Sequence, residues 1–92
     1  MRNYSYRLGT HQSVAYSTVA GTIATAVGSQ TYAVRVALVT LAGFVKIGDS
    51  PTATTSDVYM PAGLPEYFTI TPGQKVSAIS TGSGTLHVTE LS

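Results

Sequence analysis

The two histidines carry the only imidazole groups, the side chains best suited to metal binding or proton transfer near neutral pH. His11 and His87 fall on different predicted strands and lack the HxxxH spacing that presents two ligands together. His87 alternates with Leu86 and Val88, which places it on the face away from the core. The chain contains no cysteine to add a thiolate ligand. We therefore expect two histidines without partners and no metal site.

Four carboxylates are the other candidates for catalysis or cation binding. Asp49 and Asp57 flank a hydroxyl-rich loop that lacks the ligand and glycine spacing of a calcium loop, so turn capping is the favoured interpretation. Glu66 and Glu90 lie in no distinctive motif, and a glycosidase would have to hold both across a cleft. The sequence also lacks a Gly-x-Ser-x-Gly elbow and a phosphate-binding loop. It predicts no catalytic residue, no cofactor and no enzymatic activity.

Tyrosine is the more informative residue type, with six copies against two phenylalanines and no tryptophan. Tyrosine is enriched at interfaces because it joins a large apolar ring to a hydroxyl group. We expect partner contacts from two tyrosine pairs and their neighbours, namely Tyr4, Tyr6, Tyr59, Met60, Leu64 and Tyr67. Arg35 interrupts an apolar run and is expected either to point to solvent or to pair with an acidic group across a subunit contact.

The low charge content indicates that much of the surface is covered by copies of the chain or by a larger partner. The chain has 92 residues with only five basic and four acidic side chains, while 43% of the residues are hydrophobic. Thr, Ser, Ala and Gly replace the usual charged coat, and a hydroxyl costs far less to bury than a charge. Five scattered basic residues are too few for a nucleic-acid surface. Without a disulfide or metal, a small domain is expected to gain stability by association, so we predict a homo-oligomer or a larger partner.

Alternation of large and small side chains predicts the elements that position these residues. A period of two occurs in seven short runs, and residues two apart share one face of a strand. The runs are 4–8, 14–16, 23–27, 32–38, 45–47, 68–70 and 86–88. Residues 1–9 are expected to form an edge strand or an arm that adds a strand to a neighbouring subunit.

Turn residues separate the runs. Pro72-Gly73 predicts the centre of a type II turn, and Gly82-Ser83-Gly84 predicts a hairpin loop. No stretch is long enough for a crossover helix, and no linker divides the chain. The expected fold is all-β: one domain over residues 1–92, a small antiparallel β-sandwich or jelly-roll-like barrel of about eight short strands.

The segment 32–47 is the only one that resembles a membrane span. Its uncharged core, between Arg35 and Lys46, is far shorter than the roughly 20 residues that a helical span requires. The first seven residues lack the apolar region of a secretion signal. We expect no membrane partner and synthesis in a cytoplasm.

Residues 45–91 resemble small all-β virion proteins encoded among the head and tail genes of tailed bacteriophages. The resemblance covers about half of the chain and rests on strand and turn residues. It is carried by Val45–Thr54, Tyr59–Gly63, Pro65–Phe68, Pro72–Val76 and Gly84–Leu91. It implies a jelly-roll-like sandwich, commonly trimeric, that binds where major capsid subunits meet, as capsid decoration (cement) proteins do.

Three functions follow as hypotheses. The leading one is a decoration protein that stabilises a capsid in the virion. The second is a head-completion, connector or tail component. The third is a carbohydrate-binding module for host attachment, based on the tyrosines and the hydroxyl-rich loop, although no tryptophan is present for stacking on sugars.

Overall fold

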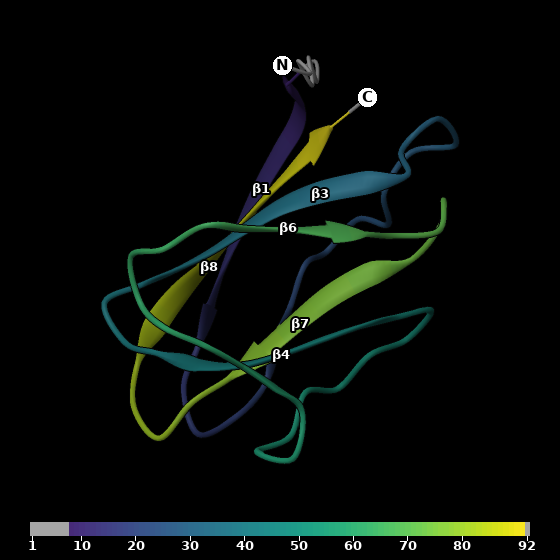
Figure 1. The fold of residues 1–92 in the computed structure, drawn as a ribbon. Coiled ribbons are helices and arrows are strands. Elements are labelled where there is room, and N and C mark those ends of the chain that lie inside the picture. The colour runs from purple at the N-terminus through teal and green to yellow at the C-terminus, as the bar shows by residue number, and fades with distance from the viewer. Residues whose placement is uncertain (1–7, 92) are drawn as a thin grey trace.

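Strands dominate the structure because β-branched and aromatic residues alternate with small ones along most of the chain. The computed structural model describes residues 8–91, which form eight strands in two four-stranded antiparallel sheets packed as a sandwich (Figure 1). The strands are β1 (Leu8–Tyr16), β2 (Gly21–Thr22), β3 (Ala33–Val39), β4 (Gly43–Gly48), β5 (Val58–Met60), β6 (Glu66–Thr69), β7 (Lys75–Ile79) and β8 (Gly84–Leu91).

The strand order corresponds to one long hairpin, made from the two halves of the chain, that folds over to give both sheets. The first sheet has the order β1-β8-β3-β6 and the second has the order β2-β7-β4-β5. The antiparallel pairs β1–β8, β2–β7, β3–β6 and β4–β5 match the first half of the chain to the second half in reverse. This connectivity is that of a jelly roll. The sheets stay separate, so the predicted sandwich is confirmed and a closed barrel is wrong.

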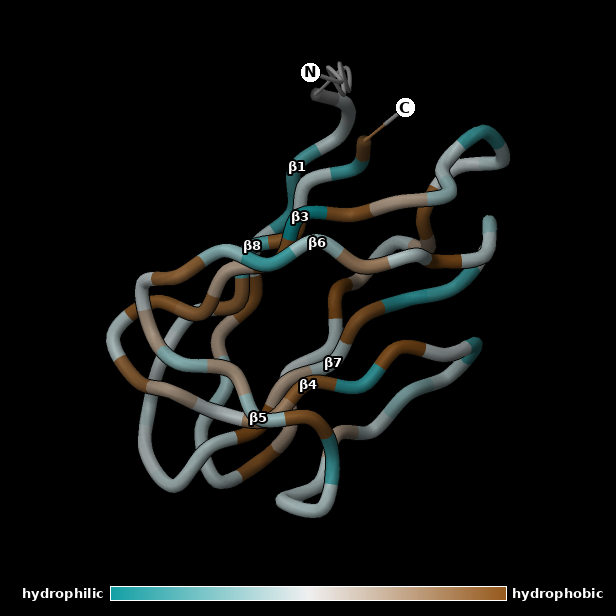
Figure 2. The backbone as a smooth tube through the Cα atoms, in the orientation of Figure 1, coloured by the Kyte–Doolittle hydropathy of each residue, from teal (hydrophilic) through white to brown (hydrophobic). Residues whose placement is uncertain are grey.

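The core lies between the sheets, where the predicted alternation is clearest in β3. Val34, Val36 and Leu38 are fully buried, and the residues between them face outward. Leu38 and Val36 pair with Leu86 and Val88 of β8. Hydrophobic residues recur along the strands of both sheets (Figure 2). Tyr32, which the pattern placed on the same buried face, is 63% exposed because it precedes β3.

Residues 23–27 do not form the predicted strand, but the residues predicted to be on its apolar face, Ile23 and Val27, are buried as expected. Regular pairing ends at Thr22, yet Ile23 and Val27 are both buried. The side-chain amide of Gln12 donates to the Thr25 carbonyl and accepts from the Thr25 amide. Gln12 thus satisfies the backbone groups of Thr25, while the Ile23 and Val27 amides still donate to the Val76 and Gln74 carbonyls. The segment can therefore bend while its apolar residues stay in the core.

The predicted hairpin at residues 81–84 is also wrong, because the turn carries the chain from β7 in the second sheet to β8 in the first. The Pro72-Gly73 turn is confirmed: Gly73 has a φ of +91°, and the Gln74 amide donates to the Thr71 carbonyl at 3.1 Å. The sequence therefore predicted where these two turns lie, but it did not predict that the turn at residues 81–84 connects strands of different sheets.

Residues of the apolar segment 32–47 form β3 and most of β4. Within residues 8–91, no helix has the length and apolar character needed to cross a membrane.

Tyr16 ends β1 and is almost fully buried, with its hydroxyl donating to the Leu41 carbonyl. Replacing it with phenylalanine removes this bond and leaves the carbonyl without that donor. We expect Tyr16→Phe to lower the free energy of unfolding by about 1–2 kcal/mol near neutral pH.

The same substitution should change how stability depends on pH. Burial raises the pKa of the Tyr16 phenol above its ordinary value of 10.0. Its contribution is therefore fully present below pH 10 and is lost as the pH rises through the folded-state pKa. In denaturant titrations from about pH 8 to about pH 11, the stability difference between the wild type and Tyr16→Phe should narrow above pH 10. A constant difference would contradict this account.

Candidate interaction surface

Large exposed hydrophobic side chains concentrate on one edge of the sandwich, formed by β5, the loop 61–65 and β6. We call this region the β5–β6 edge. Four of the seven large hydrophobic residues exposed in the described part of the chain belong to it. They are Val58 (59% exposed), Tyr59 (59%), Leu64 (60%) and Tyr67 (62%). Solvent therefore meets apolar side chains from both sheets at this edge.

The predicted contact residues Tyr59, Leu64 and Tyr67 all belong to the β5–β6 edge. Tyr59 makes an edge-on contact with Phe44, with ring centroids 5.7 Å apart. Tyr67 pairs with Arg35 across the first sheet. Leu64 follows Gly63, whose φ is +79° and whose amide donates to the Leu38 carbonyl at 2.8 Å. That bond fixes the loop to the end of β3, so Leu64 is presented from an anchored backbone.

Met60 is a wrong prediction as a contact residue. It pairs with Gly43 and is fully buried in the core. Val58 and Met60 are two residues apart and therefore lie on the same face of β5. Because β5 is at the edge of its sheet, only Met60 reaches the centre of the sandwich, and Val58 stays exposed. Tyr4 and Tyr6 lie outside the described residues.

Arg35 lies on the outer face of the first sheet, between Thr89 of β8 and Tyr67 of β6. Its side chain is half-buried at this position. The position agrees with an outward-facing arginine. Pairing with an acidic group of another subunit stays a prediction.

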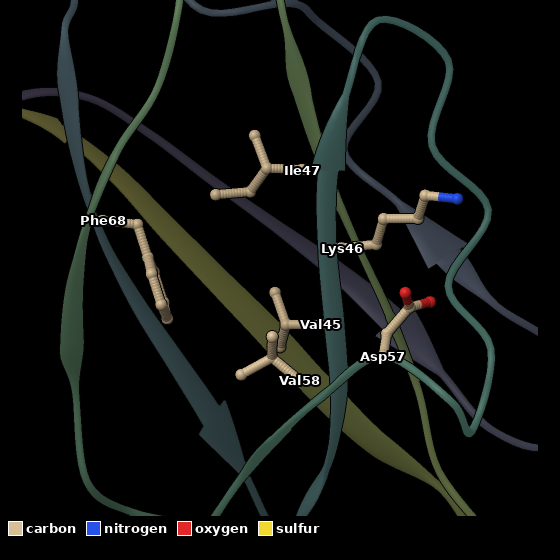
Figure 3. Close-up of a pocket in the computed structure, with 6 residues that line it drawn as sticks. All are labelled: Val45, Lys46, Ile47, Asp57, Val58 and Phe68. Carbon is tan, nitrogen blue, oxygen red and sulfur yellow. The ribbon is translucent and has the colours of Figure 1, made fainter.

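A cavity of about 240 Å³ opens beside the β5–β6 edge, between the two sheets. Val45, Ile47 and Val58 line it from the second sheet, and Phe68 lines it from the first (Figure 3). Lys46 and Asp57 also border it, but their charged ends extend to the other side of β4 (Figure 3). Small-molecule sites usually measure about 300–1,000 Å³, so this cavity is better suited to an apolar side chain.

The opposite edge, formed by β1 and β2, is closed by backbone packing. Gly21 lies so close to the Ala15 carbonyl that a Cβ atom would clash with it. The Ser80 amide donates to the Ser17 carbonyl at 2.9 Å across the connection. Among the described residues β5 pairs only with β4 and β6 pairs only with β3, just as β1 pairs only with β8 and β2 only with β7. The β5–β6 edge therefore combines apolar side chains with backbone groups available for a further strand.

The hydroxyl-rich loop 49–57 uses its polar groups internally. Asp57 Oδ2 accepts from the Thr54 amide at 2.7 Å and from the Thr54 hydroxyl at 3.2 Å, which confirms turn capping by Asp57. The buried Ser77 hydroxyl accepts from the Ala53 amide and from the Thr22 hydroxyl, both at 3.0 Å. These bonds hold the loop against the second sheet.

The two glutamates are separated by their environments. Glu66 is exposed on β6, whereas Glu90 is buried and accepts from the Gly28 amide and the Thr31 hydroxyl. Glu90 therefore acts as a structural acceptor that ties residues 28–31 to β8. Nothing in its sequence context distinguished it from the exposed Glu66.

The expectation that the histidines lack partners is wrong. Antiparallel pairing of β1 and β8 brings His11 and His87 together, with Nε2 of His11 and Nδ1 of His87 only 3.2 Å apart. Within residues 8–91, no group of three or more His, Cys, Asp or Glu residues could hold a metal ion. Only the pairing of the first strand with the last could have revealed the contact.

No protein-family model, curated protein or solved structure matches the chain.

Proposed function

We propose that this protein is a non-enzymatic structural subunit of a tailed-bacteriophage virion, and that it decorates the capsid by binding between major capsid subunits through the β5–β6 edge. The observation that carries the proposal is the exposure of Val58, Tyr59, Leu64 and Tyr67 on this edge, where Val58 also lines the cavity. The resemblance of residues 45–91 to small virion proteins supplies the biological setting.

The chemistry of this edge suits burial against protein. Large apolar side chains gain about 25 cal/mol for each Å² removed from water. Tyr59 and Tyr67 also bring hydroxyl groups that can bond to a partner at the rim. With only nine charged residues in the chain, few ionic groups would have to be desolvated.

The geometry also supports a specific mode of binding. Edge strands β5 and β6 can accept a strand from a neighbour through backbone hydrogen bonds, while the cavity takes one apolar side chain of that neighbour. Self-association, with a trimer favoured by the resemblance, would place several such edges at one junction of the capsid. Each bound subunit would stabilise the assembled shell by mass action.

The test compares two exposed aliphatic residues. Leu64→Asp places a charge in the middle of the β5–β6 edge, and burying that charge in an interface is costly. We expect it to weaken binding to capsids at least about tenfold, a loss of 1.4 kcal/mol or more. Sedimentation with capsids lacking this protein measures the binding.

Val19→Asp is the matched control, because Val19 is 73% exposed in the connection between β1 and β2. Both variants should keep the wild-type thermal stability, since exposed substitutions usually change it by less than about 0.5 kcal/mol. Equal capsid binding by both variants would remove the β5–β6 edge from the proposal. A wild-type protein that stays monomeric and ignores capsids would refute the function itself, and labelling confined to one vertex of the particle would favour a connector or tail component.

A further inference from the structure

His11 and His87 form a pair on the outer face of the first sheet. Their rings are stacked, with centroids 5.3 Å apart and planes inclined by 27°. His11 Nε2 and His87 Nδ1 are 3.2 Å apart. His11 is exposed and His87 is half-buried, so solvent reaches the pair. Two accessible imidazole nitrogens at this separation match the spacing of two ligands on one metal ion.

A second contact orients the pair. Nδ1 of His11 lies 3.0 Å from the hydroxyl oxygen of Thr89, its cross-strand neighbour on β8. Thr89 is 8% exposed, so its hydroxyl is held in place by the surrounding sheet. When Nδ1–H donates to Thr89, the lone pair of His11 is on Nε2, which is the nitrogen facing His87. Histidines that bind metals are typically fixed in this way by a bond from their other ring nitrogen.

The backbone of β1 contributes to the placement of His11. Leu8 pairs with Leu91 and His11 pairs with Thr89, so β1 carries one extra residue in this interval. Such a bulge redirects the side chains beside it. The cross-strand neighbours of His87 are Ser13 and Ala37, and both are too small to cover its ring.

The charged groups near the pair leave room for a cation. Arg35 faces the same side from β3, opposite Thr89, and two strand spacings of about 4.8 Å separate β3 from β1. Glu90 follows Thr89 on β8 but is directed to Gly28 and Thr31. The remaining coordination positions of a bound ion would be open to water.

We propose that His11 Nε2 and His87 Nδ1 chelate one divalent late first-row transition metal, such as Zn²⁺, Ni²⁺ or Cu²⁺. Metal–nitrogen bonds of about 2.0–2.1 Å over this nitrogen separation give an angle near 100° at the metal, close to tetrahedral. Imidazole favours these metals over Mg²⁺ and Ca²⁺. His87 must bind through a lone pair on Nδ1, so its proton moves to Nε2 through solvent and no net proton is released from the neutral ring.

The ion would join β1 to β8, the first and last strands of the fold. Because the folded chain would bind it and the unfolded chain would not hold the pair together, the metal should stabilise the fold by mass action. This inference does not depend on the proposed capsid function, since His11 and His87 lie on β1 and β8, and β3 separates them from β6 and the β5–β6 edge.

The test is a calorimetric titration of the purified full-length protein with Zn²⁺ near pH 7.5. We expect one ion per chain and a rise in Tm of a few degrees at saturation. His11→Gln and His87→Gln should each weaken Zn²⁺ binding at least about tenfold, since either change removes chelation. Thr89→Val, which keeps both ligands and loses only the orienting hydroxyl, should weaken it about tenfold. Mg²⁺ serves as the control ion and should not bind.

Nuclear magnetic resonance of the wild-type chain gives a readout that needs no variant. The ring proton signals of both His11 and His87 should move together as Zn²⁺ is added. Failure of the folded wild type to bind at about 1 mM Zn²⁺ would overturn the proposal. So would wild-type affinity in both histidine variants, or signal changes confined to other residues.

Discussion

Gly84→Ala should lower the free energy of unfolding by about 3 kcal/mol or more, because no space exists for a methyl group at this position. A Cβ atom there would lie 2.5 Å from the Tyr16 hydroxyl oxygen, 2.6 Å from the carbon that bears it and 2.8 Å from the Val39 carbonyl oxygen. The Tyr16 ring is buried and bonded to Leu41, so it cannot move aside cheaply. Chemical denaturation would measure the loss.

Gly48→Ala is the matched control for this prediction. Gly48 also lies at the end of a strand, but a Cβ there would meet only Pro51 at 3.9 Å, an ordinary contact. It should leave stability almost unchanged or raise it slightly, since alanine restricts the unfolded chain. Similar losses in both variants would show that the crowding around Tyr16 is not the cause.

Glu90→Ala is expected to cost about 3 kcal/mol. The Glu90 carboxylate accepts from the Thr31 hydroxyl at 2.5 Å and from the Gly28 amide at 3.1 Å, and Thr31 is itself buried. Removing the carboxylate leaves both donors without this acceptor, and hydrogen bonds to a charged group contribute about 1.5–3 kcal/mol each. Denaturant unfolding measures the loss, and faster hydrogen exchange at the Gly28 amide should accompany it.

Glu90→Gln distinguishes the contribution of the hydrogen-bond acceptor to stability from that of the negative charge. Glutamine keeps a side-chain oxygen of the same reach, so the bonds to Gly28 and Thr31 can persist in weaker form. We expect a loss of about 1 kcal/mol, clearly smaller than for alanine. Equal losses in the two variants would mean that a neutral oxygen contributes little and that the negative charge of the carboxylate is required, since glutamine keeps the side-chain stem.

The sequence predicted the fold class because burial in a sandwich follows a simple rule along each strand. In β3, the alternation of Val34, Val36 and Leu38 with small or polar residues was sufficient to identify the buried face. The Pro72-Gly73 turn was predictable for a similarly local reason, since proline and glycine fix the backbone angles themselves.

The features that the sequence did not predict depend on which strands pair with one another in the folded protein. The alternation in residues 23–27 suggested a strand, but Gln12 of β1 takes over the pairing of Thr25. Residues 81–84 resembled a hairpin loop because local sequence does not reveal that β7 and β8 belong to different sheets. The His11–His87 contact was missed for the same reason.

The candidate site was predicted in part. Tyr59, Leu64 and Tyr67 are exposed on one edge, whereas Met60, which follows Tyr59 in the sequence, is buried. Exposure at an edge strand depends on how far the neighbouring sheet extends over it, and composition carries no such information. The cavity lined by Val45, Ile47, Val58 and Phe68 also arises only when the two sheets are assembled.

The central place of β8 has a consequence for biosynthesis. β8 lies between β1 and β3 in the first sheet, yet it is the last of the eight described strands to leave the ribosome. Until it emerges, β1 and β3 have no shared neighbour, and unpaired strand edges are prone to join other nascent chains. A topology dominated by pairing between distant segments also folds slowly, on a timescale of milliseconds to seconds. Slower synthesis at reduced temperature should therefore raise the yield of correctly folded protein, and loss of the final strand should prevent folding altogether.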